Sequence, residues 1–194
     1  MEYQTIIVEE KNAVGYLSLN RPEQFNSFTP QMCLEIVEVL TQWKDDTEIR
    51  IIVIAAIGKA FCAGQAISPD LFGGGAIDLG FVLEKYFNPL LALINTLPKV
   101  IICAVNGVAA GAGASLVLLC DIVIAAKSAS FSQIFSKIGL IPDCGATWLL
   151  PRMIGFAKAK ALMLTAEKIS ADEAERLGMI YKVVEDDQLQ IEVV

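Results

Sequence analysis

Three short apolar runs constrain the fold of this chain more than any other feature. The runs Ile51–Ala56, Val100–Val105 and Ile122–Ala126 have the length of strands and carry no charge. Continuous apolar runs of this kind are typical of strands that are covered on both faces, as in parallel sheets. Longer segments with helical patterns lie between them, so strands and helices alternate along the chain. This order predicts an α/β fold with a mostly parallel sheet.

The segment before these runs predicts a hairpin and a helix. Residues 5–9 and Val14–Leu19 are rich in β-forming residues, and Lys11-Asn12 separates them. Thr29 followed by Pro30 marks the start of a helix. We expect Glu35 and Glu38 to face solvent from this helix. Its other face is expected to be buried and consists of Met32, Ile36, Val39, Leu40 and Trp43.

The later elements are predicted from turn and capping residues. Residues 58–68 and 69–75 are expected to be loops, the second one flexible because it ends in Gly73–Gly75. Ser170 to Glu173 forms a capping box, which predicts a helix that ends at Gly178. The other expected elements are a helix over residues 77–97 bent near Pro89, a turn at Asn106-Gly107, helices over Ala112–Leu119 and Phe156–Thr165, and a last strand over residues 180–184.

Composition excludes several classes of protein. Hydrophobic residues make up 55% and charged residues 19% of 194 residues, which favours one compact core domain over residues 1–194. No apolar run reaches the roughly 18 residues that span a bilayer, and the N-terminus lacks the pattern of a signal peptide, so we expect no membrane partner and a cytoplasmic location. The net charge of −7 and the absence of a basic run argue against nucleic-acid binding.

The chain contains no histidine, which limits the chemistry it can perform. Ser-His-Asp and Cys-His mechanisms are excluded, as are histidine-ligated metals. A general acid or base must therefore be Asp, Glu, Lys, Tyr or Cys. The five cysteines contain no CxxC pair, so we expect no metal site and no disulfide framework, and interpret them as buried structural thiols.

Two loops rich in small residues are candidates for a ligand site. Residues 61–65 (FCAGQ) and 106–113 (NGVAAGAG) follow predicted strands, and ligands in α/β sheets bind at the carboxyl ends of strands. A helix that begins near Ala112 would direct free N–H groups at a ligand. Alternatively, the glycines only allow close packing of helix and strand. A dinucleotide-binding fingerprint does not fit, because Leu116 occupies the position of its last glycine.

These loops, with two further stretches, resemble the crotonase (enoyl-CoA hydratase/isomerase) superfamily along the whole chain. The resemblance depends on residues 20–27 (NRPEQFNS), 61–65, 104–113 (AVNGVAAGAG) and 139–143 (GLIPD), which occur in this order. Within the superfamily the chain is most similar to the 1,2-epoxyphenylacetyl-CoA isomerase branch of phenylacetate breakdown, through residues 104–114 and 135–151.

The resemblance implies a ClpP/crotonase spiral of ββα units, here without its C-terminal helical part, because the chain ends at Val194. It implies a homotrimer or a dimer of trimers, and an acyl-CoA substrate with no separate cofactor. The backbone N–H groups of Gln65 and Ala112 would form an oxyanion hole for the thioester. The implied substrate-binding residues are Ala63, Gly64, Gln65, Ala66, Ile67, Gly111, Ala112, Phe135 and Trp148.

The resemblance also indicates which reaction to expect. Hydratases of the family use two glutamates, whose positions correspond to Ser115 and Phe135 here. Isomerases use an acid at the position of Asp143, whose apolar neighbours should raise its pKa. On residue physics alone Asp143 could instead be the N-cap of the following helix. We therefore expect an acyl-CoA isomerase that acts on a ring epoxide or shifts a double bond between the 3- and 2-enoyl positions.

Several alternatives stay open at this stage. The chain could be an enoyl-CoA hydratase-like protein of another specificity, or a non-catalytic crotonase-like binding module. Arg21 and Lys59 could contact phosphates of CoA or be solvated charges. Family members commonly carry Asp where this chain has Ala66, which puts the stability of the loop in question. The width of the pocket is expected to depend on Phe72, Leu79, Phe135 and Trp148.

Overall fold

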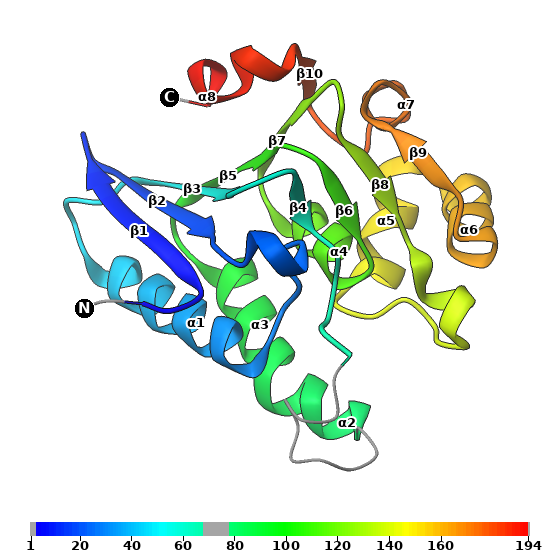
Figure 1. Ribbon diagram of the computed structural model, residues 1–194, viewed down its shortest axis with the longest axis horizontal. Helices are drawn as coiled ribbons and strands as arrows, with labels where there is room; N and C mark the ends of the chain where they lie inside the picture. The colour runs from blue at the N-terminus through cyan, green and yellow to red at the C-terminus, as the bar shows by residue number, and fades with distance from the viewer. Residues whose placement is uncertain (1–2, 68–77, 194) are drawn as a thin grey trace.

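A computed structural model describes residues 3–67 and 78–193, and its larger sheet confirms the α/β class (Figure 1). Only β1 runs antiparallel to its neighbour, and the other strands of this sheet are parallel. The order across the sheet is β1 (Ile6–Lys11), β2 (Val14–Leu19), β3 (Ile51–Ala56), β5 (Val100–Val105), β7 (Ile122–Ala126) and β10 (Lys182–Val184).

A second sheet is built from strands of three residues. Its order is β4 (Ala60–Cys62), β6 (Val108–Ala110), β8 (Ser130–Ser132) and β9 (Lys168–Ser170). Each long strand β3, β5 and β7 is followed by a short strand of the second sheet and then by a helix, which is the expected ββα order. The prediction of plain loops at β4 and β6 was wrong, because strands of three residues are too short to show a period of two.

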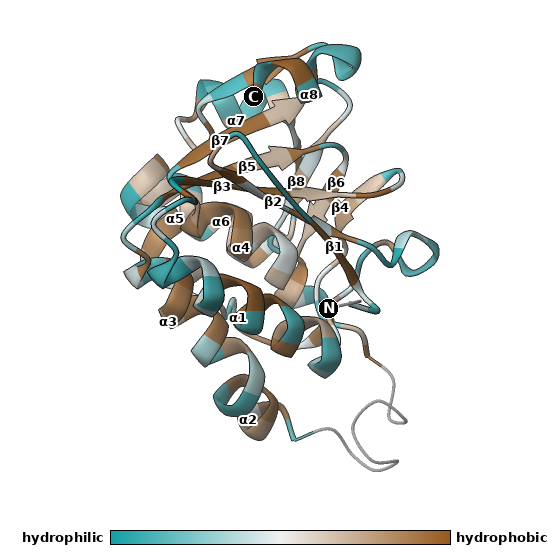
Figure 2. Ribbon diagram, turned by 90° about the vertical axis from the view of Figure 1, so that its left-hand side faces the viewer, coloured by the Kyte–Doolittle hydropathy of each residue, from teal (hydrophilic) through white to brown (hydrophobic). Residues whose placement is uncertain are grey.

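Helices cover both faces of the larger sheet, as Figures 1 and 2 show. On one face the core is filled by α1 (Pro30–Asp45), α3 (Asn88–Thr96) and α4 (Ala112–Leu119). On the other face α8 (Leu189–Glu192) places Leu189 against the sheet. None of the helices in the described part of the chain has the length and hydropathy needed to cross a bilayer. The elements near the smaller sheet are η4 (Ile134–Ile138), α5 (Ala146–Ile154), α6 (Phe156–Thr165) and α7 (Ala171–Arg176).

Predicted helix boundaries are confirmed where a capping residue was identified. The Thr29 hydroxyl accepts a hydrogen bond of 3.2 Å from the N–H of Met32 at the start of α1. The Ser170 hydroxyl accepts one of 3.2 Å from the N–H of Glu173 in α7. Gly178 follows α7 with a φ of +76°, a conformation that L side chains disfavour. These boundaries could be predicted because the determining contacts are local.

The helix expected over residues 77–97 is divided into three parts. It begins with Asp78 as the N-cap of α2 (Leu79–Val82), continues as a π-helical turn, η3 (Leu83–Phe87), and ends as α3. The wide turn precedes Pro89, which cannot donate a backbone hydrogen bond to the preceding turn, and a π-bulge is a known cause of bending. Residue 77 and the loop containing Gly73–Gly75 and Phe72 lie outside the described residues.

Glu35 corrects a prediction, because its side chain is buried rather than exposed. Only 5% of Glu35 is accessible, whereas Glu38 is exposed as expected. The Glu35 carboxylate accepts hydrogen bonds from the N–H groups of Gln4 (3.0 Å) and Thr5 (2.9 Å). The Thr5 hydroxyl and the Gln31 amide also donate to it. The prediction failed since these donors come mainly from the segment before β1, about 30 residues away, which a helical pattern does not include.

Candidate active site

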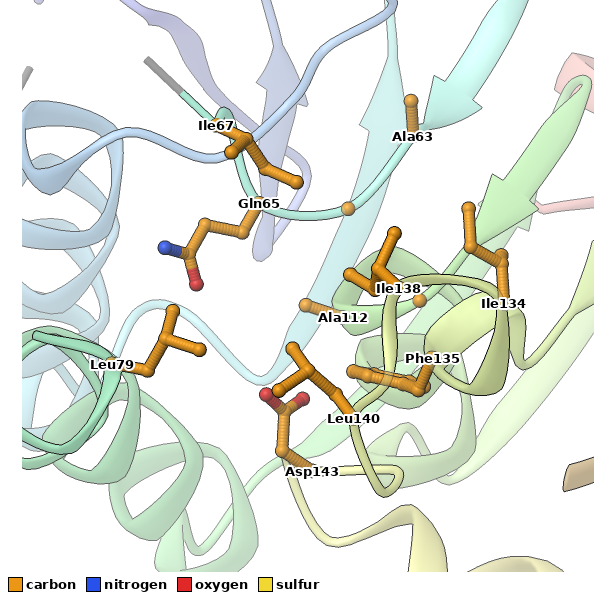
Figure 3. A pocket seen from close by; sticks show the side chains of 12 residues that line it. Ala63, Gln65, Ile67, Leu79, Ala112, Ile134, Phe135, Ile138, Leu140 and Asp143 are labelled. Atoms are coloured by element: carbon orange, nitrogen blue, oxygen red, sulfur yellow. The ribbon is translucent and has the colours of Figure 1, made fainter. Parts of the chain in front are cut away.

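A mostly apolar cavity of about 380 Å³ lies where β4 and β6 end (Figure 3). Ala63 and Gly64 continue the chain beyond β4, and Gly111 and Ala112 continue it beyond β6. The cavity therefore lies at the carboxyl ends of two parallel strands, as ligand sites of α/β sheets do. These strands are the short β4 and β6, whereas the sequence predicted the loops to follow β3 and β5 directly. The described residues that line it are Ala63, Gly64, Gln65, Ile67, Leu79, Gly111, Ala112, Ile134, Phe135, Ile138, Leu140 and Asp143.

Gly64 brings the two loops into direct contact. It has a φ of +98°, and a Cβ placed on it would lie 3.0 Å from the carbonyl oxygen of Ala110 and 3.5 Å from the nitrogen of Ala112. A side chain at this position would therefore strain the backbone and separate the loops. The absence of a side chain allows the backbone at Gln65 and the N-terminus of α4 to border the same space.

The N–H of Gln65 is free because of the way the loop pairs with Phe28. The N–H of Phe28 donates to the oxygen of Gly64 (2.8 Å), and the N–H of Ala66 donates to the oxygen of Phe28 (2.9 Å). In an extended segment successive N–H groups point to opposite sides, so the N–H of Gln65 faces away from Phe28. Among the hydrogen bonds of residues 3–67 and 78–193 it has no acceptor.

The N–H of Ala112 is free because it opens a helix. Ala112 is the first residue of α4, and its N-cap is Gly111, which has a φ of +53° and provides no side-chain cap. The first N–H groups of a helix lack acceptors within it, and the positive end of the helix dipole lies there. Gly111 donates its own N–H to the oxygen of Ser132 (2.9 Å), so the loop is anchored to β8. The two free N–H groups come from separate loops that border the same cavity, and such a pair of donors is what an oxyanion hole consists of.

Two other glycines of these loops have a packing role. A Cβ on Gly113 would lie 2.4 Å from the carbonyl oxygen of Cys62, and one on Gly107 would lie 2.3 Å from that of Lys59. Gly113 thus lets α4 pack directly on β4, and Gly107 does the same for the turn before β6. The packing interpretation is therefore confirmed for Gly107 and Gly113, whereas Gly64 and Gly111 border the cavity.

Asp143 lies in the wall of the cavity with part of its carboxylate unpaired. Its Oδ1 is buried and has no hydrogen-bond partner, although the side chain as a whole is half-buried. Burial raises the pKa of the Asp143 carboxyl, while the neighbouring Cys144 thiol and the local backbone lower it less. The N-cap of α5 is Gly145, so the interpretation of Asp143 as a helix cap was wrong.

The two positions where hydratases of the superfamily carry glutamates hold no acid here. Phe135 is buried and forms part of the cavity wall. Ser115 is fully buried in α4, and its hydroxyl donates to the oxygen of Gly111 (3.2 Å). Among the described residues that line the cavity, Asp143 is the only one with an acidic or basic side chain. Within the described wall, Asp143 is therefore the side chain that can exchange a proton with a ligand.

Some predicted site residues lie elsewhere. Trp148 is 63% exposed on α5 with the Arg152 guanidinium over its ring, and it does not line the cavity. Ala66 is bound to Phe28 through its N–H and also lies outside the wall. Arg21 donates to the backbone oxygen of Ser27, which is a contact within its own loop.

Lys59 also has a partner within the chain, because its ammonium group lies 5.2 Å from the centre of the Phe25 ring. Cys144 is buried next to Asp143, and burial raises the pKa of its thiol, in agreement with its interpretation as a buried structural thiol. Three wall residues were missed by the sequence analysis, namely Ile134, Ile138 and Leu140. They are isolated apolar positions around η4 without a pattern that would identify them.

Comparisons with known proteins identify one family of similar proteins. The enoyl-CoA hydratase/isomerase family model matches residues 9–194. The chain is 49% identical to the 1,2-epoxyphenylacetyl-CoA isomerase of Escherichia coli K12, over 95% of this chain and 71% of that protein. It is 38% identical to the crotonyl-CoA hydratase of Syntrophomonas wolfei, over 100% of this chain and 74% of that protein.

A solved structure of an enoyl-CoA hydratase is also similar to this chain. The crystal structure of enoyl-CoA hydratase from Bacillus anthracis superposes with a TM-score of 0.90 at 34% identity. The similarity covers 98% of this chain and 74% of that one. Sequence and structure comparisons therefore point to the same group of proteins, among them both an isomerase and hydratases.

Proposed function

The chain belongs to the enoyl-CoA hydratase/isomerase (crotonase) family of enzymes acting on acyl-CoA, and on this premise we propose that it is an acyl-CoA isomerase with Asp143 as its proton shuttle. One observation carries the proposal. Asp143 is the only acid in the cavity wall of the described chain, one of its oxygens is buried and unpaired, and burial raises its pKa. A raised pKa brings an aspartate closer to the value at which it both takes and returns a proton.

The first part of the mechanism is the stabilisation of an enolate. The N–H groups of Gln65 and Ala112 would donate to the thioester oxygen, which gains negative charge when the α-proton is removed. The uncapped start of α4 supports this charge through the helix dipole. Removal of one such donor typically costs about 10²–10³ in rate. The same N–H groups serve every reaction that passes through a thioester enolate, so they do not by themselves select isomerisation.

The second part is a proton transfer by Asp143. For a 3-enoyl thioester, the carboxylate takes a proton from C2, and the electron pair moves into the thioester to form a dienolate. The protonated Asp143 then returns this proton to C4, the double bond moves to the 2-position, and the carboxylate is regenerated. One group is sufficient because the proton removed is the proton returned. An isomerase of this kind needs no second carboxylate.

Hydration would need a residue that activates water. The two candidate positions hold Ser115 and Phe135, and neither is a base at neutral pH. A hydratase remains the second candidate function, because the relatives include a crotonyl-CoA hydratase. The similarity to a 1,2-epoxyphenylacetyl-CoA isomerase favours a ring epoxide as the substrate over a simple double-bond shift.

The proposal is tested by incubating the chain separately with 3-enoyl-CoA, 2-enoyl-CoA and a ring-epoxide acyl-CoA. The products are separated and identified by liquid chromatography. We expect isomerisation of at least one of these substrates without formation of 3-hydroxyacyl-CoA. Accumulation of 3-hydroxyacyl-CoA would instead establish a hydratase with an unassigned base. Binding of all three thioesters without any product would establish a non-catalytic module.

A further inference from the structure

The side chain of Gln65 has no role in the mechanism above, which uses only its backbone N–H. Its amide nitrogen is nevertheless buried and has no hydrogen-bond partner. Gln65 belongs to the wall of the cavity, and in Figure 3 its amide oxygen is turned toward the space in front of the Asp143 carboxylate, while its nitrogen is turned away from that space. A half-turn about the terminal side-chain bond exchanges the two atoms, so the carboxamide can present to the cavity a donor that is not used within the protein.

Burial of such a donor needs an explanation, because buried polar groups in native proteins are nearly always hydrogen-bonded. Among the described side chains of the wall, Ile67, Leu79 and Leu140 are hydrocarbons and offer no acceptor. Asp143 Oδ1 faces the same cavity, but it is unpaired as well, so the two groups do not bond to each other. Both groups therefore need a partner that enters the cavity.

We infer that the Gln65 carboxamide is a specificity-determining group, which donates a hydrogen bond to an oxygen on the acyl part of the substrate. The class of substrate is then an acyl thioester with an ether, epoxide, hydroxyl or carbonyl oxygen near the reacting carbons. A hydrocarbon acyl group of the same size would cover the amide and leave it unpaired, which sites of this kind disfavour. The inference rests on the proposed function, because it assumes that the cavity takes the acyl group.

The inference also separates the two reactions left open above. A ring epoxide carries an acceptor oxygen, whereas a 3-enoyl chain carries none beyond the thioester carbonyl. Loss of a hydrogen bond that leaves a buried group unpaired corresponds to about a 10- to 100-fold loss in affinity. Discrimination of this size is measurable with unreactive analogues that differ by a single atom.

The experiment uses hexanoyl-CoA and its 3-oxa, 4-oxa and 5-oxa analogues, in which one oxygen replaces one methylene. Their affinities for the 194-residue chain are measured by isothermal titration calorimetry. Gln65→Leu removes the amide and keeps the backbone N–H, Gln65→Met is a second variant in case the first does not fold, and Leu79→Met alters the same wall without removing a donor.

We expect the preference for at least one oxa analogue over hexanoyl-CoA to be about 10-fold greater in the wild type than in Gln65→Leu or Gln65→Met. Leu79→Met should keep the wild-type preference. A preference that is absent at every oxygen position, or that survives both Gln65 variants, overturns the inference while leaving the proposed function intact. Failure of all four thioesters to bind overturns the proposed function first, and the inference with it.

Discussion

Two carboxylates of this chain, Glu35 and Asp143, illustrate opposite consequences of burial. Glu35 lies on α1 and accepts hydrogen bonds from Gln4, Thr5 and Gln31. Asp143 lies in the wall of the cavity, where one of its oxygens has no donor at all. Both groups are removed from water to some extent, so the difference between them arises from the donors around them.

Their pKa values move in opposite directions for this reason. Burial alone raises the pKa of a carboxyl group, because it destabilises the charged form. At Glu35 burial also acts in this direction, but the hydrogen bonds from Gln31, Thr5 and Gln4 outweigh it and the pKa lies below its ordinary value. At Asp143 burial dominates and the pKa lies above its ordinary value. The first carboxylate is suited to holding structure together and the second to exchanging a proton.

The largest expected effect is on activity, where substitutions of the two carboxylates should differ most. Asp143→Asn should lower kcat of the isomerisation by about 10²–10⁴-fold, because the amide cannot accept the proton. Glu35→Gln, the matched change at the other carboxylate, should leave kcat of the folded enzyme unchanged. Steady-state kinetics on the substrate found active with the wild type measures both. Full activity of Asp143→Asn would show that another group shuttles the proton.

The second expected effect is on the free energy of unfolding, to which the two carboxylates should contribute differently. Glu35→Ala should lower the free energy of unfolding by about 2–4 kcal/mol, because it leaves the N–H groups of Gln4 and Thr5 buried without an acceptor. Asp143→Asn should change it by less than about 1 kcal/mol, since no hydrogen bond to the unpaired oxygen is lost. Urea denaturation at neutral pH measures both values. Comparable losses at the two sites would contradict the assignment of Glu35 as the structural carboxylate.

The smallest expected effect is a difference in how the contribution of each carboxylate to stability depends on pH. The folded pKa of Glu35 is lowered, so its contribution to stability is present above the ordinary glutamate pKa and is lost as the pH falls through the folded value. The folded pKa of Asp143 is raised, so its contribution is present below the ordinary aspartate pKa and is lost as the pH rises through the folded value.

The stability advantage of wild type over Glu35→Gln should therefore grow as the pH rises from about 3 to about 7, and its advantage over Asp143→Asn should shrink. Thermal denaturation of the three proteins across this range measures the two differences. Slopes of the same sign would contradict the opposite pKa shifts. Changes below about 1 kcal/mol are expected at Asp143, which is only half-buried.

Much of the fold could be predicted because it depends on local patterns. Strands β3, β5 and β7 and helices α4 and α6 have the boundaries that the sequence indicated. The caps at Thr29 and Ser170 were identified from residue types alone, because a cap and its partner lie within three residues. The short strands β4, β6 and β8 were not predicted from the residues, since they are hydrogen-bonded to one another and to β9, which are distant along the chain.

The candidate site was predictable in part. The sequence identified the two loops and Asp143, and the resemblance gave the roles expected of Gln65 and Ala112. The sequence did not show that Gly64 brings the two loops into contact, or that Gly113 serves the packing of α4 on β4. Both roles depend on contacts with atoms of distant segments. The exposed position of Trp148 on α5 also depends on packing rather than on residue type.

The sequence by itself thus determined the α/β class, the family and the position of the one acid that the proposed chemistry needs. Only the tertiary structure decided which buried polar groups have partners. Glu35 has its donors since the segment before β1 packs on α1, whereas Asp143 Oδ1 and the Gln65 amide face a cavity. Local periodicity encodes burial, but the partners of a buried group come from residues far along the chain, and these partners fix its charge and its chemistry.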